Sequence, residues 1–193
     1  MNHAAAHTIE TFGGSFLDVS DPDPDDITLG DVVHGLSRAC RFAGQCLTFY
    51  SVAEHAVIVS ERLERQGAPA DVIFAGLHHD DAEAFLGDIT RPLKHLIPHY
   101  GELEEQMLCA IARALNLPLT SFTDPRIKEA DDWALAAEAY HLMSSHGRTW
   151  HVEGLYDPRT DPKPITGLDP WTAAARFMDR HGELRLRLGV PLP

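Results

Sequence analysis

Two histidines and three acidic residues occupy one short segment of the chain, His78-His79-Asp80-Asp81-Ala82-Glu83. If the segment is helical, each residue turns the chain by about 100°, so His79, Asp80 and Glu83 share a face with upstream apolar residues. His78 and Asp81 are then expected on the opposite side, pointing outward. Charged residues at a helix end are usually solvated, but an imidazole and a carboxylate on an apolar face are harder to explain in that way.

Two more polar side chains interrupt apolar stripes elsewhere in the chain. His55 stands between Val52 and Val59 at helical spacing, and Asp131 lies among apolar residues while its neighbour Asp132 points away. A lone histidine in such a place is more often a hydrogen-bonded core residue than a ligand. A buried carboxylate without a partner, however, is protonated or strongly destabilising.

One cation bound between three helices would satisfy all of these buried groups. Two imidazoles and two carboxylates suit a borderline divalent metal such as Mn²⁺, Co²⁺, Fe²⁺ or Zn²⁺, and they leave coordination positions for water and phosphate. The spacing therefore predicts a divalent-metal site formed by His55, His79, Asp80 and Asp131.

Helical periodicity dominates the elements that must position these residues. We expect a short extended or hairpin element in an N-terminal arm, residues 1–28, and then a helical core over residues 29–143. A loop and a final helix from Pro170 to Leu188 complete residues 144–193. The metal-binding segment is expected in a helix from near Pro69 to about Phe85, and another helix from Tyr100 to Leu117. With 193 residues and 44% apolar content, the chain is expected to form one all-α domain.

Composition excludes several classes of partner. The chain has 16 basic and 29 acidic residues, a formal net charge of −13, so we expect no binding to bulk nucleic acid or to a membrane surface. Cys40, Cys46 and Cys109 form no CxxC pair, and their odd number does not indicate a disulfide framework. The N-terminus lacks the pattern of a signal peptide, so we expect a cytoplasmic protein. A small phosphorylated substrate stays possible because a bound metal can reverse the local field.

The order of the motifs resembles the H…HD…D signature of the HD superfamily of metal-dependent phosphohydrolases. His55, then His79-Asp80 with Glu83, then Gly87-Asp88, then Lys128-Glu129-Ala130-Asp131 follow one another in that order. The segment Gly87-Asp88-Ile89-Thr90-Arg91-Pro92-Leu93-Lys94 is similar to one in the bacterial 5′-deoxynucleotidase-like branch. The resemblance covers about residues 31 to 143 and implies an HD-domain helical bundle, with a possible homodimer.

The resemblance also implies chemical roles. His55, His79, Asp80 and Asp131 match the metal ligands of the superfamily. Glu83 and Asp88 match the acids that position or deprotonate the attacking water and assist the leaving alkoxide, and which of the two is the base stays open.

Four residues are candidates for contact with substrate. Arg41 matches an arginine that holds the phosphate, and a guanidinium offers two parallel donors to it. Arg91 and Lys94 are basic residues that could equally be solvated surface charges. Glu138 could support the ligands or bind a sugar, although a partly buried structural glutamate is about as frequent.

The leading expectation is hydrolysis of deoxyribonucleoside 5′-monophosphates to nucleoside and phosphate. A triphosphohydrolase acting on deoxynucleoside triphosphates is the first alternative, because Arg91 and Lys94 could bind a longer phosphate chain. A metal-containing module that binds a ligand without turnover is the second, and the presence of the expected catalytic acids argues against it.

Overall fold

The computed structural model describes residues 6–161 and 163–189. Helices dominate, and the one small sheet within the described residues is an N-terminal hairpin, so the predicted all-α class with a short hairpin is confirmed. The α-helices are α1 (Leu29–Arg38), α2 (Val52–Arg65), α3 (Ala70–Leu77), α4 (Glu83–Leu86), α5 (Arg91–Lys94), α6 (Tyr100–Ala114), α7 (Pro125–Leu142) and α8 (Pro170–Leu188). The short 3₁₀ helices are η1 (Pro24–Asp26), η2 (Arg41–Gly44) and η3 (Leu119–Thr123).

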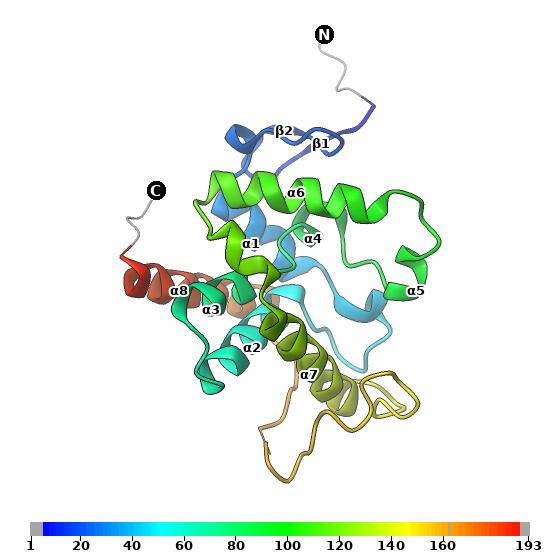
Figure 1. Ribbon diagram of the computed structural model, residues 1–193. Helices are drawn as coiled ribbons and strands as arrows, with labels where there is room; N and C mark the ends of the chain where they lie inside the picture. The colour runs from blue at the N-terminus through cyan, green and yellow to red at the C-terminus, as the bar shows by residue number, and fades with distance from the viewer. Residues whose placement is uncertain (1–5, 162, 190–193) are drawn as a thin grey trace.

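The hairpin pairs β1 (Thr8–Glu10) with β2 (Phe16–Asp18) in antiparallel register and is drawn above α6 in Figure 1. Its inward residue, Leu17, is completely buried. Asp31 anchors the hairpin to the helical body, because its carboxylate accepts the Gly13 backbone N–H at 2.6 Å. The same carboxylate completes a capping box with Thr28 at the start of α1, so one side chain fixes both elements.

Local sequence signals account for the starts of the long helices. The Ser51 hydroxyl accepts the backbone N–H of Glu54 at the start of α2, and Asp124 caps α7 ahead of a proline in the first turn. The Glu54 side chain does not return to the cap but accepts the Leu168 N–H at 2.9 Å, which ties the loop before α8 to α2. Helix α8 occupies the predicted span.

The predicted helix from Pro69 to Phe85 is wrong in its second half. Helix α3 ends at Leu77, residues 78–82 form a turn, and α4 begins at Glu83. The His78 and Asp81 side chains hydrogen-bond to each other across this turn, at 2.6 Å. Such local side-chain bonds compete with helix continuation. Helix α6 likewise ends at Ala114, three residues before the predicted Leu117.

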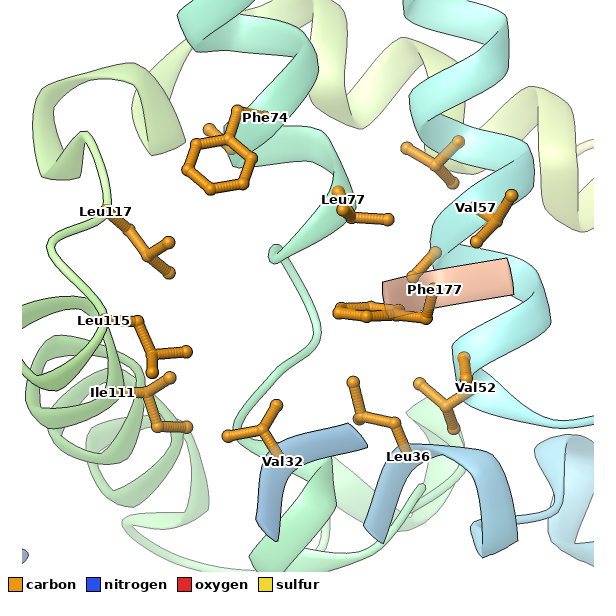
Figure 2. Close-up of a cluster of buried hydrophobic side chains, with 14 of the residues drawn as sticks. Val32, Leu36, Val52, Val57, Phe74, Leu77, Ile111, Leu115, Leu117 and Phe177 are labelled. Carbon is orange, nitrogen blue, oxygen red and sulfur yellow. The ribbon is translucent and has the colours of Figure 1, made fainter. Parts of the chain in front are cut away.

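The main hydrophobic core lies where α8 packs against α1, α2 and α3. Figure 2 shows Phe177 of α8 among Leu36, Val52, Val57 and Leu77, which come from the other three helices. Helix α7 packs against the opposite side of α2, and the long segment after it extends to the lower edge of Figure 1 before α8 begins. The described part of the chain contains no helix long and apolar enough to cross a membrane.

Candidate metal centre

The four predicted ligands come from three elements that meet at one place. His55 lies on α2, His79 and Asp80 on the turn after α3, and Asp131 on α7. The His55 Nε2 atom lies 3.3 Å from Asp131 Oδ1 and 3.5 Å from Asp80 Oδ2, and the His79 Nε2 atom lies 3.3 Å from the same Asp80 oxygen. Ligand atoms of one cation bound at about 2.1 Å stand roughly 3.0 to 3.4 Å apart. The spacing of His55, His79 and Asp80 therefore fits a single divalent metal, and Asp131 joins this group through its contact with His55.

Among the described residues, the two imidazoles have no hydrogen-bond partner for the nitrogens that face the carboxylates. Neither His55 Nε2 nor His79 Nε2 has a hydrogen-bond partner among the described residues, although both atoms are buried. Each ring is held from behind, because His79 Nδ1–H donates to the Gly76 carbonyl at 2.8 Å and His55 Nδ1–H donates to Glu138 at 2.6 Å. This arrangement directs the Nε2 atom of each ring toward the carboxylates, and Nε2 is a nitrogen through which histidines bind metals.

Glu138, on α7, is completely buried and lies behind His55 of α2. Its carboxylate accepts hydrogen bonds from the Tyr50 hydroxyl at 2.9 Å, from His55 at 2.6 Å and from Arg41 Nε at 3.1 Å. Burial raises the pKa of Glu138, but the neighbouring Arg41 and His55 outweigh it, so the carboxyl pKa is lowered overall. The structure thus places this candidate substrate residue behind the ligands, where it orients His55 and Arg41.

Opposing effects also act on His55. Burial and the Arg41 charge lower the pKa of His55, whereas Glu138 and Asp131 raise it. The raising effects are larger, so the His55 pKa is about 10. A proton on Nε2 would therefore serve in place of a cation between the carboxylates. The site concentrates negative charge around one point, which is the electrostatic condition for binding a divalent cation.

Arg41 enters the site from η2 and is largely buried. Its Nη1 atom lies 3.7 Å from Asp80 Oδ2, and its Nε is bound to Glu138, so the guanidinium is held beside the ligands in a fixed orientation. The chain that follows is strained, because Phe42 and Ala43 have φ values of 59° and 51°, in the left-handed region. The Sγ atoms of Cys40 and Cys46, which flank this segment, are 3.9 Å apart as free thiols.

The two predicted catalytic acids lie close enough for the charge of Asp88 to act on Glu83. Glu83, at the start of α4, is 5% exposed, and its Oε2 atom has no hydrogen-bond partner among the described residues. Burial, together with the nearby charges of Asp80 and Asp88, raises the Glu83 pKa well above its ordinary value. Asp88 follows Gly87, whose φ of 79° turns the chain at the end of α4.

The two other basic candidates lie at different depths. Lys94 reaches the site, since its Nζ donates to Glu83 at 3.2 Å and to Glu104 at 2.6 Å. Arg91 lies at the more exposed rim, where its Nη1 donates to His151 Nε2 at 2.6 Å. Asp132 is also at this rim, where Arg91 and His151 approach its carboxylate, and Lys128 pairs with both Asp132 and Asp131.

The prediction that His78 and Asp81 point outward is wrong, because both side chains are completely buried. They do lie on the side opposite His79, but α8 covers that side. On α8, the Nδ1 atom of His181 lies 2.9 Å from the Nε2 atom of His78. Sequence reasoning missed His181, since a single histidine in an amphipathic helix carries no distinguishing pattern.

Comparisons with known proteins place the chain among bacterial relatives. It is 37% identical over 177 residues to the uncharacterized protein YfdR of Escherichia coli strain K12, covering 91% of this chain and 94% of the relative. It is 33% identical over 181 residues to the uncharacterized protein RCAP_rcc00048 of Rhodobacter capsulatus, covering 87% of this chain and 90% of the relative. No model of a known protein family matches the chain.

Proposed function

We propose that this chain, which belongs to one family with Escherichia coli YfdR, is an HD-type metal-dependent phosphohydrolase acting on deoxyribonucleoside 5′-monophosphates. The convergence of two partnerless imidazole nitrogens with the carboxylates of Asp80 and Asp131 is the observation that carries the proposal. It agrees with the resemblance of the motifs to that superfamily. We place the activity in the cytoplasm, where nucleotides are available.

His55, His79, Asp80 and Asp131 are the residues that would hold the cation. When bound, a divalent cation neutralises charge on phosphoryl oxygens and makes a nearby water more acidic. Two neutral imidazoles favour Mn²⁺, Co²⁺, Fe²⁺ or Zn²⁺ over Mg²⁺, which prefers oxygen ligands.

The remaining groups have complementary tasks around the phosphate. Arg41, whose Nε is occupied by Glu138, keeps its Nη atoms toward the ligands, where they can donate to two phosphoryl oxygens. Glu83 has one carboxylate oxygen unengaged and accepts the proton of the attacking water or orients that water. Asp88, close enough to influence Glu83 and Arg41, is the second acid available to protonate the leaving alkoxide.

A substrate panel tests this function directly. Protein stripped with chelator is assayed with Mn²⁺, Co²⁺, Zn²⁺ or Mg²⁺ on deoxyribonucleoside and ribonucleoside monophosphates and on deoxynucleoside triphosphates. We expect no turnover without metal, restoration by Mn²⁺ or Co²⁺, and release of inorganic phosphate from the deoxyribonucleoside monophosphates. Full turnover in excess chelator would contradict the metal mechanism.

The product identifies the alternatives. Release of triphosphate would favour the triphosphohydrolase, for which the contact of Lys94 with Glu83 is the supporting observation. Metal binding with no turnover of any nucleotide would favour a non-catalytic ligand-binding module.

Two adjacent aspartates provide a matched control. Asp131→Asn should remove bound metal and activity, because Asp131 lies 3.3 Å from His55 Nε2. Asp132→Asn should retain both, because within the described part of the chain Asp132 pairs with Arg91, Lys128 and His151 and contacts neither His55 nor His79. Equal metal content in the two variants would rule out Asp131 as a ligand.

A further inference from the structure

The turn that carries His79 and Asp80 has a buried polar support on its reverse side. His78 Nδ1–H donates to Asp81 Oδ2 at 2.6 Å, which closes the turn from within. The His78 Nε2 atom then accepts from His181 Nδ1–H, at 2.9 Å, across to α8. Three polar side chains, two of them completely buried and His181 2% exposed, thus form one continuous chain of hydrogen bonds.

Apolar rings surround this chain of hydrogen bonds and bury it. The His78 ring stands edge-on to Phe74 at 4.9 Å and to Phe177 at 5.3 Å between centroids. The His181 ring also contacts Phe74, at 5.2 Å. A His78 nitrogen that lost its donor would therefore be left buried and unsatisfied, which costs about 1 to 3 kcal/mol in proteins.

The position of the support links it to the metal ligands. His78 is bonded through its backbone to His79, and Asp81 follows Asp80, so the supporting pair brackets the two ligands. Helix α3 ends at Leu77, and the turn after it is held by shorter backbone bonds, from the His78 N–H to the Ala75 carbonyl at 3.1 Å and from the Asp81 N–H to the His78 carbonyl at 3.3 Å. The side-chain hydrogen bonds of His78 add to this backbone support and tie the turn to α8.

We infer that His181 is a positioning residue for metal binding, acting through His78 and Asp81 on the turn that presents His79 and Asp80. The inference rests on the proposed metal centre and adds α8 to its determinants. Residues behind metal ligands commonly change metal affinity by about 10- to 100-fold when replaced. His181 is one residue further from the metal, so we expect the lower end of that range.

The test compares three substitutions by a measurement of binding. Apo protein is titrated with Co²⁺, whose visible absorption reports the affinity and the geometry of the site independently of turnover. His181→Phe keeps an aromatic ring but removes the donor to His78, and it should weaken Co²⁺ binding about tenfold and alter the visible spectrum. His181→Asn places an amide N–H near the position of Nδ1 and should restore most of the affinity.

Phe177→Leu is the matched control on the same helix, because Phe177 contacts the His78 ring without a hydrogen bond. It should lower the unfolding temperature of the apo protein and leave Co²⁺ affinity unchanged. Urea unfolding of each apo variant measures stability in parallel, so that a folding defect is recognised. If His181→Phe does not fold, the comparison of His181→Asn with His181→Leu at a permissive temperature decides the same question.

The outcomes separate this inference from the proposed function. Wild-type protein that binds no Co²⁺ would overturn both. Wild-type protein that binds Co²⁺, with His181→Phe binding equally tightly and with the same spectrum, would leave the metal centre intact and reduce His181 to a packing residue. Weakened binding in His181→Phe and recovery in His181→Asn would establish the positioning role.

Discussion

At the scale of single residues, Glu138 orients several of the side chains around it. Its buried carboxylate accepts three donors and thereby fixes His55, Arg41 and the Tyr50 hydroxyl. A buried charge is tolerated only when its hydrogen-bonding capacity is filled, and here the donors include His55 and Arg41, the side chains proposed to bind metal and phosphate. The two proposed functions would therefore depend on one buried carboxylate.

Glu138→Gln should damage both functions. The amide would turn an N–H toward a donor and leave the Arg41 charge without its partner, so we expect a loss of stability of about 3 to 5 kcal/mol. Metal affinity should fall at least roughly tenfold, because His55 loses its orientation. Urea unfolding of the apo protein and titration with Mn²⁺ measure these effects. Glu129→Gln, at an exposed position of α7, is the control and should change neither.

His181 gives the stability of the protein a specific pH dependence. Burial, with the nearby His78 and Arg185, lowers the His181 pKa from 6.5 to about 3, so the folded protein keeps this imidazole neutral. The unfolded chain binds a proton near its ordinary pKa, and protonation therefore favours unfolding. The contribution is complete above about pH 6.5 and is lost as the pH falls toward 3.

The expected signature is a difference between two proteins. Across pH 6.5 to 4.5 the apo wild type should lose up to about 2.7 kcal/mol more stability than His181→Asn, which has no group to titrate there. Parallel pH profiles for the two proteins, measured by urea unfolding, would show that His181 titrates normally. Asp81, whose pKa is raised by burial, faces the same network and is present in both proteins.

At the scale of elements, the approach of α1 to α4 positions Glu83. Gly35 of α1 packs directly against the Ala84 backbone, and a Cβ at Gly35 would lie 2.8 Å from the Ala84 Cα. Backbone cannot move aside as a flexible side chain does, so only glycine allows this contact. The short helix that carries Glu83 depends on it, since α1 and α4 are in close contact.

Gly35→Ala should therefore displace α4 and impair hydrolysis. We expect a loss of stability of about 1 to 3 kcal/mol from overpacking, and a fall in kcat larger than any change in metal content. Gly30→Ala, on the same helix, would place its Cβ 3.5 Å from the Thr28 hydroxyl and should be neutral or stabilising by up to about 1 kcal/mol. A Gly35→Ala protein as stable and active as Gly30→Ala would contradict the close packing.

Helix boundaries marked by caps and prolines could be predicted from sequence, and those set by tertiary contacts could not. Pro170–Leu188 and the start at Pro125 follow from local signals that the structure retains. The break after Leu77 depends on a hydrogen bond between His78 and Asp81, and no propensity anticipates it. The helical phase still predicted that His79 and Asp80 lie together. A helix that ends just before two residues changes the direction of their side chains by only part of a turn.

The burial of His78 and Asp81 was beyond the reach of periodicity. A helix that packs against one neighbour keeps a solvent-exposed face, whereas α3 packs against both α2 and α8. Polar residues on both faces of such a segment are buried, and sequence alone does not reveal which later helix covers the second face. Glu138 was identified as a candidate, but its role behind His55 needed the three-dimensional contacts.

At the scale of the whole molecule, the predicted ligands join segments far apart in the chain. His55 and Asp131 lie on α2 and α7, with His79 and Asp80 between them in sequence. A cation bound at this place would cross-link them only in the folded state, because the unfolded chain holds these residues apart. Metal binding and global stability are then thermodynamically linked.

Metal should raise the unfolding temperature measurably. At a free concentration of about one hundred times Kd, the folded state gains about 2.7 kcal/mol, which for a chain of this size corresponds to roughly 5 to 10 °C. Scanning calorimetry with Mn²⁺ or Co²⁺ measures the shift, and Asp131→Asn should abolish it. If neither metal changes the unfolding temperature of the wild-type protein, the predicted metal site is wrong.

The placement of α8 has a consequence for the order of events during synthesis. Helix α8 follows all the other described elements, yet it packs in the main core and supplies the imidazole behind the turn with His79 and Asp80. Chains elongate at about 5 to 20 residues per second and fold from the N-terminal side first. Every predicted ligand therefore leaves the ribosome before the helix that secures two of them. The nascent chain would acquire its mature affinity for metal only after α8 is released and docked.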